Sequence, residues 1–139
     1  MVNPLIVSAK ILHINESLSR IKEKRGIPFD DFAKDRDSQD IVLFNLQIAI
    51  QGCIDIASHI VSDNNWKVAD TLSSVIDILR DKKVITLMTH QVMRRMVGFR
   101  NLIVHEYANL EMKQVYKVLT EHLKDFDTYL KEITLFAKL

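Results

Sequence analysis

Hydrophobic residues recur at helical spacing through most of this chain, and the first such stretch predicts a helix over residues 5–24. At 3.6 residues per turn its apolar positions form one stripe, with the basic residues at its end outside that stripe. The stripe comprises Leu5, Ile11, Leu12, Leu18 and Ile21. Gly26 and Pro28 predict its end. The acidic stretch over residues 30–37 then predicts a polar connection with room for one helical turn.

The longest predicted helix covers residues 38–62. Asp37 or Ser38 is a suitable N-cap, because a side-chain oxygen there can accept a hydrogen bond from the first turn. The first half of this helix, Ile41–Ile50, is apolar on nearly every side. A helix of that kind lies either at the centre of a bundle or in an oligomer interface. The run Asp63–Trp66 predicts its end.

Three further helices follow. We expect a short helix over residues 70–81, a longer one over 86–105 and another over 110–138, for which Asn109 is the expected cap. The pattern therefore predicts an all-α fold. We expect an antiparallel bundle of four long helices and one short helix, forming a single domain over residues 1–139.

Composition narrows the fold class further. Only 3 of the 139 residues are glycine and 2 are proline, too few for the many turns of a sandwich or barrel. The lone Cys53 excludes a disulfide scaffold. The first ten residues do not resemble a signal peptide, and the longest uncharged stretch, Ile41–Ile54, is too short to span a bilayer. We expect a soluble, cytoplasmic protein without a membrane partner.

Candidate chemistry gathers near the end of the predicted helix over 86–105. The polar or ionisable residues there are Arg100, Asn101, His105 and Tyr107. A histidine can gain or lose a proton near neutral pH, and an arginine holds a fixed positive charge whose planar donors fit a phosphate. One proton carrier and one anion clamp suffice for chemistry on a phosphodiester without a metal.

The spacing of this group leaves its interpretation open. Five residues at about 100° each place His105 about 140° from Arg100 around an ideal helix. The two share a site only if the helix ends or distorts between them, or if two chains meet there. Asn101 lies on the same face as His105 and can orient its imidazole. By spacing alone, a charge pair that complements the helix dipole is the favoured interpretation.

Local charge favours an anionic substrate. The segment Arg80–His105 holds six basic residues and one acidic residue, a net +5 in a chain whose total is +1. Arg94 and Arg95 lie within it and are candidate substrate-binding residues. The alternative is an ordinary solvated helix face.

Other ionisable residues give weaker signals. Asp55 and His59 are four residues apart, as two metal ligands on a helix would be, but no third ligand is visible. An Asp–His pair that stabilises the helix is the favoured interpretation. The isolated His13, His90 and His122 are expected at the surface or its rim. The sequence has no zinc signature and no glycine-rich phosphate loop, so we expect neither a metal nor a cofactor.

The segment Arg100–Tyr107 resembles the motif of the HEPN superfamily, in which an arginine and a polar residue are followed by a histidine after four to six residues. Tyr107, two positions beyond the histidine, narrows the resemblance to the HepT-like branch. Further segments that resemble this branch are Arg36–Asp37, Phe44–Ile50, Cys53–Ile60 and Met96–Phe99. The resemblance therefore covers nearly the whole chain.

This resemblance implies a homodimer in which two motifs face a shared cleft. It implies a toxin, neutralised by an MNT-type nucleotidyltransferase antitoxin, that is a metal-independent endoribonuclease. The ribose 2′-OH would attack its own phosphate, leaving a 2′,3′-cyclic phosphate and a 5′-OH. His105 would move the proton, Arg100 would stabilise the phosphorane and Asn101 would be a supporting polar group. The implied substrate is RNA, such as tRNA or mRNA, because DNA lacks the 2′-OH.

Tyr107 has a second implied role. In HepT/MNT pairs the antitoxin transfers AMP onto the motif tyrosine, whose added charge and bulk would exclude RNA. The alternative for Tyr107 is a rim aromatic packed under the last helix. The alternative for the whole chain is a non-catalytic nucleotide- or RNA-binding dimer that serves mainly as the nucleotidyltransferase's substrate.

Overall fold

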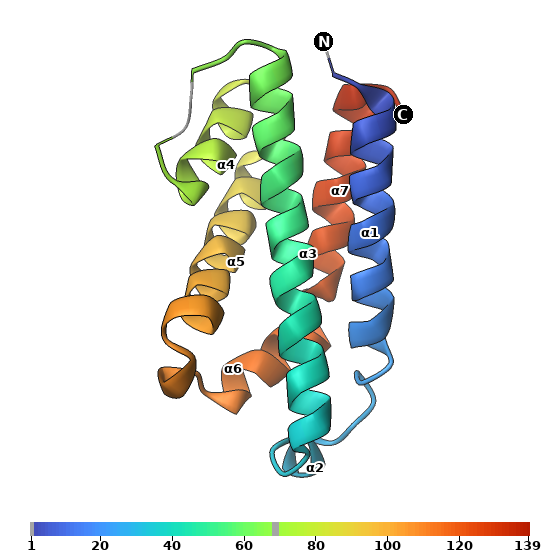
Figure 1. The fold of residues 1–139 in the computed structure, drawn as a ribbon, viewed down its shortest axis with the longest axis vertical. Helices are drawn as coiled ribbons and strands as arrows, with labels where there is room; N and C mark the ends of the chain where they lie inside the picture. Colours follow the sequence, from blue (N-terminus) through green and yellow to red (C-terminus); the bar gives the residue numbers. More distant parts are fainter. Residues whose placement is uncertain (1, 68–69) are drawn as a thin grey trace.

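The computed structural model describes residues 2–67 and 70–139, and its regular elements in those residues are all helices. The predicted all-α fold is confirmed. The elements, in chain order (Figure 1), are α1 (Pro4–Lys22), α2 (Phe29–Phe32), α3 (Arg36–Asp63), α4 (Leu72–Asp81), α5 (Leu87–His105), the 3-10 turn η1 (Tyr107–Asn109), α6 (Met112–Lys117), the π-helical segment η2 (Val118–His122) and α7 (Leu123–Ala137). The four helices predicted over the first 105 residues begin and end within about two residues of these bounds.

Helix α3 forms the centre of the bundle, with α1 on one side and α5 on the other (Figure 1). By length and composition it could cross a membrane, since its most apolar window has a mean hydropathy of 1.6. The uncharged stretch Ile41–Ile54, judged from the sequence to be too short to span a bilayer, is shorter than the whole apolar helix. However, 56% of the window is buried inside the bundle. Its apolar character is therefore that of a core helix, which is one of the two places predicted for it.

The start of α3 differs from the prediction. Its cap is Asp35, not Asp37 or Ser38. One carboxylate oxygen of Asp35 accepts a hydrogen bond from the backbone N–H of Ser38 at 3.1 Å, and the other accepts from the Ser38 hydroxyl at 2.6 Å. These bonds stabilise the charged form and lower the pKa of Asp35. Ser38 thus lies in the first turn as a donor, and the helix begins two residues earlier than predicted.

Helix α1 packs on α3 along a line that the predicted stripe only partly follows. Val7, Ile14 and Ile21, spaced by seven residues, are buried. Leu5 and Leu12 were expected in the stripe but are 80% and 62% exposed. A Cβ on Gly52 of α3 would lie 2.6 Å from Cγ1 of Ile14, so only glycine allows this close approach. Of the apolar residues on α1, the line through Val7, Ile14 and Ile21 is therefore buried, whereas Leu5 and Leu12 face solvent.

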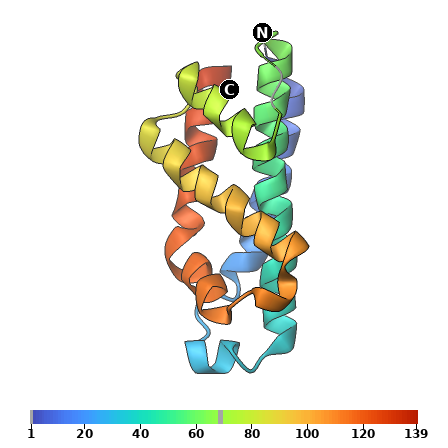
Figure 2. The same ribbon diagram turned by 90° about the vertical axis from the view of Figure 1, so that its left-hand side faces the viewer.

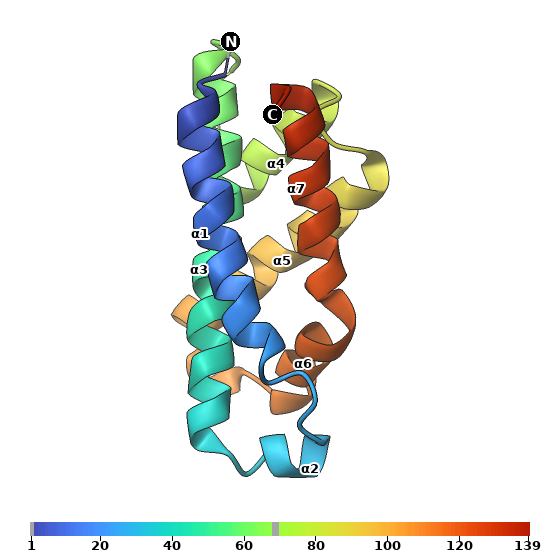
Figure 3. The same cartoon turned by 90° about the vertical axis from the view of Figure 1, so that its right-hand side faces the viewer.

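The predicted helix over 110–138 is interrupted. Its residues form α6 and α7, joined by the π-helical η2, which widens the turn without breaking the amphipathic stripe. Asn109 is not a cap: it lies in η1, and the residue before α6 is Glu111, whose side chain makes no capping bond. Figure 3 shows α7 returning past α1 to end near the N-terminus.

Helix α5 crosses the bundle obliquely, with α4 packed above it and α6 below its far end (Figure 2). The buried residues of its first half and middle include Thr89, Met93, Met96 and Val97. Beyond them Ile103 alone is buried in its last turns. The C-terminal end of α5 is therefore fixed to the core but open to solvent, and it lies beside the N-terminal half of α3.

Candidate active site

The last turns of α5 position the predicted catalytic residues. Arg100 is half-buried and one of its Nη groups donates to Oδ1 of Asn101 at 3.2 Å. The Nε of Arg100 is buried and, within residues 2–67 and 70–139, has no hydrogen-bond partner. His105 is the final residue of α5 and is exposed. In the described chain neither residue forms an ion pair with a carboxylate.

Arg100 and His105 point in different directions from one helix. Because α5 continues as an α-helix through His105, the two side chains stay about 140° apart. The distortion that would bring them together within one chain does not occur in α5. Asn101 and His105 are both exposed on the same side of the helix. Asn101 accepts from Arg100, and among the described residues no hydrogen bond joins it to the imidazole.

Arg100 reaches into a cavity of about 450 Å³ between α1 and α3. Sequence reasoning did not find its polar lining, which consists of Lys10 and His13 from α1 and Gln47, Gln51 and Asp55 from α3. His13, predicted as an isolated residue at the surface or its rim, lines the cavity that receives Arg100. The four-residue spacing of the three α3 residues was a usable signal, because it places them on one helical face.

Tyr107 follows α5 directly, in η1. Its side chain is 46% exposed and its hydroxyl donates to Oδ1 of Asp40 at 3.5 Å. Asp40 also lies 3.8 Å from the Nε of Arg36, at the start of α3. The interpretation of Tyr107 as an aromatic packed under the last helix does not describe this position. Its hydroxyl is a surface group beside α3.

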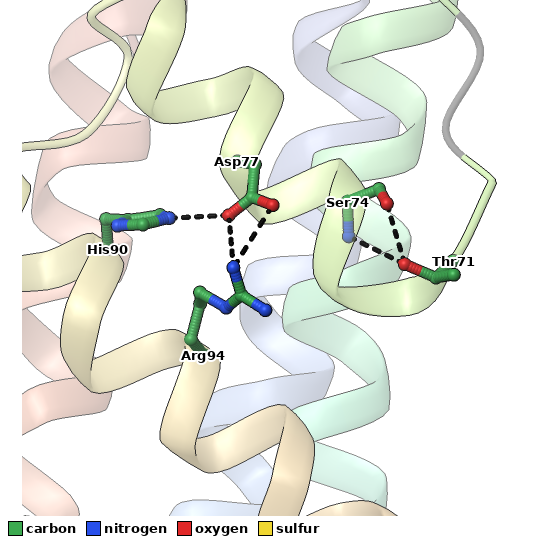
Figure 4. A network of polar contacts seen from close by, with 5 residues as sticks. All are labelled: Thr71, Ser74, Asp77, His90 and Arg94. Carbon is green, nitrogen blue, oxygen red and sulfur yellow. Dashed lines mark hydrogen bonds and ion pairs between the residues drawn. The ribbon is translucent and has the colours of Figure 1, made fainter.

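The two candidate substrate-binding arginines face different partners. Arg94 donates to both carboxylate oxygens of Asp77 in α4, at 3.2 and 3.3 Å. His90 joins the same carboxylate through its Nε2 at 2.6 Å (Figure 4). Arg95 instead lines a groove between α5, α6 and η2. Arg94 therefore fastens α4 to α5, whereas Arg95 forms no ion pair with any described residue.

Three expectations about histidines need correction. His90 was expected at the surface or rim but is 8% exposed, because it packs beneath α4 against Asp77. His59 pairs with Asp63 at 3.1 Å and not with Asp55, which accepts from Gln51 instead. His122 pairs with Asp125 at 2.9 Å. Among the described residues, no three His, Cys, Asp or Glu side chains gather closely enough to hold a metal ion.

Cys53 lies in the core, as predicted. Burial raises the pKa of its thiol well above the ordinary range, because the charged thiolate would lose its hydration. The hydroxyl of Tyr129 donates to the backbone oxygen of Cys53 at 2.8 Å, and burial likewise raises the pKa of that tyrosine. Neither group is available for chemistry with a ligand.

Comparisons with known proteins all point to one family. Residues 14–133 match the family model described as ribonuclease HepT-like. The chain is 32% identical to an mRNA nuclease HepT of Shewanella oneidensis, over 95% of this chain and 98% of that protein. It is 26% identical to a tRNA nuclease HepT of Aphanizomenon flos-aquae, over 95% and 90%. A solved structure of a tri-AMPylated Shewanella oneidensis HEPN toxin in complex with an MNT antitoxin matches with a TM-score of 0.88 and 31% identity, covering 96% of this chain and 99% of that one.

Proposed function

This chain belongs to the ribonuclease HepT-like family, and from that membership we propose that it is the toxin of a toxin–antitoxin pair. Its activity is that of a metal-independent endoribonuclease. The chain is a single HepT-like domain over residues 1–139, and it acts on RNA in the cytoplasm. The relatives named above cleave mRNA in one case and tRNA in the other, so both are candidate substrates.

The observation that carries this proposal is the unpaired state of Arg100 and His105. In the described chain neither residue forms an ion pair with a carboxylate, and the buried Nε of Arg100 has no hydrogen-bond partner, so an anion would complete the site. His105 accepts the proton of the ribose 2′-OH while the 2′ oxygen bonds to phosphorus. Arg100 stabilises the charge on the phosphorane. The 5′ oxygen leaves with a proton, and a 2′,3′-cyclic phosphate remains.

A homodimer supplies the geometry that one chain lacks. Arg100 and His105 diverge by about 140° on α5, so each site takes groups from two chains. The partly exposed stripe of α3 beside them is suited to such an interface: Phe44 in it is 64% exposed, with Ile41 and Ile48 on the same face. We place the shared cleft on this stripe. Asn101 acts there as a supporting polar group for Arg100.

Neutralisation uses Tyr107. An MNT-type nucleotidyltransferase transfers AMP from ATP to its hydroxyl: the phenol oxygen bonds to the α-phosphorus, pyrophosphate leaves and the phenol loses its proton. The added phosphate places negative charge beside the end of α5 and competes with RNA for Arg100. The exposed hydroxyl and its position two residues beyond His105 support this assignment.

Cleavage of total tRNA and mRNA in excess EDTA tests the activity. We expect the wild type to cleave RNA and to leave 2′,3′-cyclic phosphate ends, and His105→Ala to leave the RNA intact while keeping its helical content and thermal stability. Cleavage by both proteins would exclude His105 as the catalytic group. Loss of cleavage on adding EDTA would contradict a metal-independent mechanism.

Transfer of label from ATP carrying a labelled α-phosphate tests the modification. With an MNT-type nucleotidyltransferase we expect label on the wild type and none on Tyr107→Phe, because only the hydroxyl is lost. Tyr116→Phe is the matched control, since the Tyr116 hydroxyl is already engaged by the backbone oxygen of Ile27 at 2.6 Å. Equal labelling of wild type and Tyr107→Phe would place the modification elsewhere.

A second candidate function is a non-catalytic nucleotide- or RNA-binding dimer that serves as the nucleotidyltransferase's substrate. The cavity beside Arg100 favours it, because cationic Lys10 and the amides of Gln47 and Gln51 surround an apolar floor of nucleotide size. Tight binding of RNA by a dimer that yields no cleaved product in EDTA would select this alternative.

A further inference from the structure

A second groove, of about 520 Å³, lies between α5 and the chain that runs from α6 into α7. Arg95 and Phe99 enter it from α5, and Gln114 and Lys117 enter it from α6. The π-helical segment η2 forms part of its wall, and such segments occur often at functional sites. The cavity beside Arg100 shares none of these residues, so the groove is a separate site on the same helix.

The charges of this groove favour an anionic ligand. Within residues 2–67 and 70–139, neither Arg95 nor Lys117 has a carboxylate partner. Asp125 also lines the groove, but its carboxylate is engaged by His122 at 2.9 Å. Two cations therefore face the groove with the local acid already paired, and a phosphate would satisfy both.

The floor of the groove is apolar. Met96 and Val118 are 4% and 8% exposed, and the ring of Phe99 is half-buried beside them. A groove that combines cations with an aromatic ring suits a nucleotide of a single strand, whose phosphate meets the cations while its base covers the ring. A simple acidic peptide would use the charges but not this ring.

Position on α5 connects the groove to the catalytic histidine. Ten residues separate Arg95 from His105, which is about 15 Å along the helix and about 80° around it. Both side chains are exposed on the solvent side of α5, and Gly98 and Asn101 between them are exposed as well. A strand whose scissile phosphate lies at His105 can follow this side of the helix to the groove.

We propose that Arg95 and Lys117 bind an RNA phosphate a few nucleotides away from the bond that is cleaved, with Phe99 as the platform for the adjoining base. This subsite rests on the proposed function, since it requires an RNA substrate. The proposal gives two neighbouring arginines different roles. Arg95 binds substrate, whereas Arg94 binds Asp77 and does not contact the substrate.

The test compares Arg95→Ala, Lys117→Ala and Arg94→Ala, each in the full chain and in EDTA. Binding of a labelled single-stranded RNA is measured on a His105→Ala background, where the RNA stays intact. Cleavage of a long RNA and of a dinucleotide, which holds only the scissile phosphate, is measured with His105 present. Arg94→Ala is the matched control, because it removes the same charge one residue away.

We expect Arg95→Ala and Lys117→Ala each to weaken binding of the long RNA about tenfold, and Arg94→Ala to leave it nearly unchanged. The slope of log affinity against log salt should fall by about 0.7 for each of the first two variants, the value for one phosphate contact on a single strand. Cleavage of the dinucleotide should keep its wild-type kcat/KM in both.

Equal losses in Arg94→Ala and Arg95→Ala would overturn the subsite, since only bulk charge would then matter. Unchanged RNA binding by Arg95→Ala, with loss of binding to the antitoxin, would assign the groove to a protein partner instead. If the wild type cleaves the dinucleotide and the Arg95→Ala and Lys117→Ala variants bind long RNA as tightly as the unsubstituted protein does, the subsite is refuted. The proposed function then still stands. A wild type that neither binds nor cleaves RNA refutes both.

Discussion

Each half of α5 carries one histidine and one arginine close together, but the two pairs have different surroundings. In the first half, His90 and Arg94 lie four residues apart and both bind the carboxylate of Asp77, at 2.6 and 3.2 Å. In the second half, Arg100 and His105 lie five residues apart, and no carboxylate of the described chain binds either one. The helix itself is regular throughout.

This difference shows that the role of a His–Arg pair depends on the neighbouring element that packs against it, and not on the helix that carries it. Helix α4 covers the first half of α5 and brings Asp77 to it (Figure 4). The carboxylate binds both side chains and fixes their geometry, so the three residues fasten the two helices together. Among the described residues no carboxylate forms an ion pair with Arg100 or His105 in the second half, so both side chains remain available to a substrate phosphate.

The largest expected effect is the difference in RNA cleavage between variants of His105 and His90. His105→Ala should lower kcat/KM for RNA about a thousandfold, because it removes the proton carrier. His90→Ala should keep the cleavage rate of each folded molecule and lower the melting temperature instead, since it breaks only the fastening to α4. Cleavage assays in EDTA beside thermal melts of both variants check this. A similar loss of cleavage in His105→Ala and His90→Ala would contradict the proposed difference between the two halves of α5.

A stability effect of intermediate size comes from Asp77→Asn. The amide keeps the shape of the side chain but removes the charge that holds both His90 and Arg94. We expect the free energy of unfolding to fall by about 1 to 2 kcal/mol, because Asp77 and Arg94 are partly exposed and the amide keeps weaker contacts with both partners. Denaturant titration measures this change. An unaltered midpoint would show that the Asp77 network does not fasten α4 to α5.

The smallest effect is expected at the joint between the halves. A Cβ on Gly98 would meet no atom within 4 Å, so Gly98→Ala should add about 0.5 to 1 kcal/mol of stability through helix propensity alone. Cleavage should be unchanged, because neither half depends on flexibility there. Higher stability together with a lower kcat would instead indicate that α5 bends at Gly98 during the reaction.

The long helices could be predicted from the sequence because their apolar periodicity extends over several turns. The N-terminus of α3 could not be placed, since Asp35, Asp37 and Ser38 are all good caps and only the fold selects Asp35. The interruption at η2 was also missed. The stripe residues Val115, Leu119, Leu123 and Phe126 are buried on both sides of this segment, so the apolar spacing shows no break there.

The candidate site could be predicted only where its signal is local. Arg100, His105 and Tyr107 lie within eight residues and carry a recognisable motif. The difference between Arg94 and Arg95 is not local, because Asp77 lies 17 residues before Arg94 and Lys117 lies on another helix. Lys10 and His13 join Arg100 only after α1 packs on α3. Long-range packing, invisible in a single sequence, decides these cases.

The comparison of kcat/KM in EDTA between Asn101→Asp and Asn101→Ala tests the central claim most directly. Asn101 already accepts a hydrogen bond from Arg100 at 3.2 Å, so the aspartate would give Arg100 the carboxylate that Arg94 has in the first half. The alanine removes the same hydrogen bond without adding charge. The account predicts that Asn101→Asp cleaves RNA at least about tenfold more slowly than Asn101→Ala, with both proteins equally folded. An aspartate variant as active as the alanine variant would contradict it.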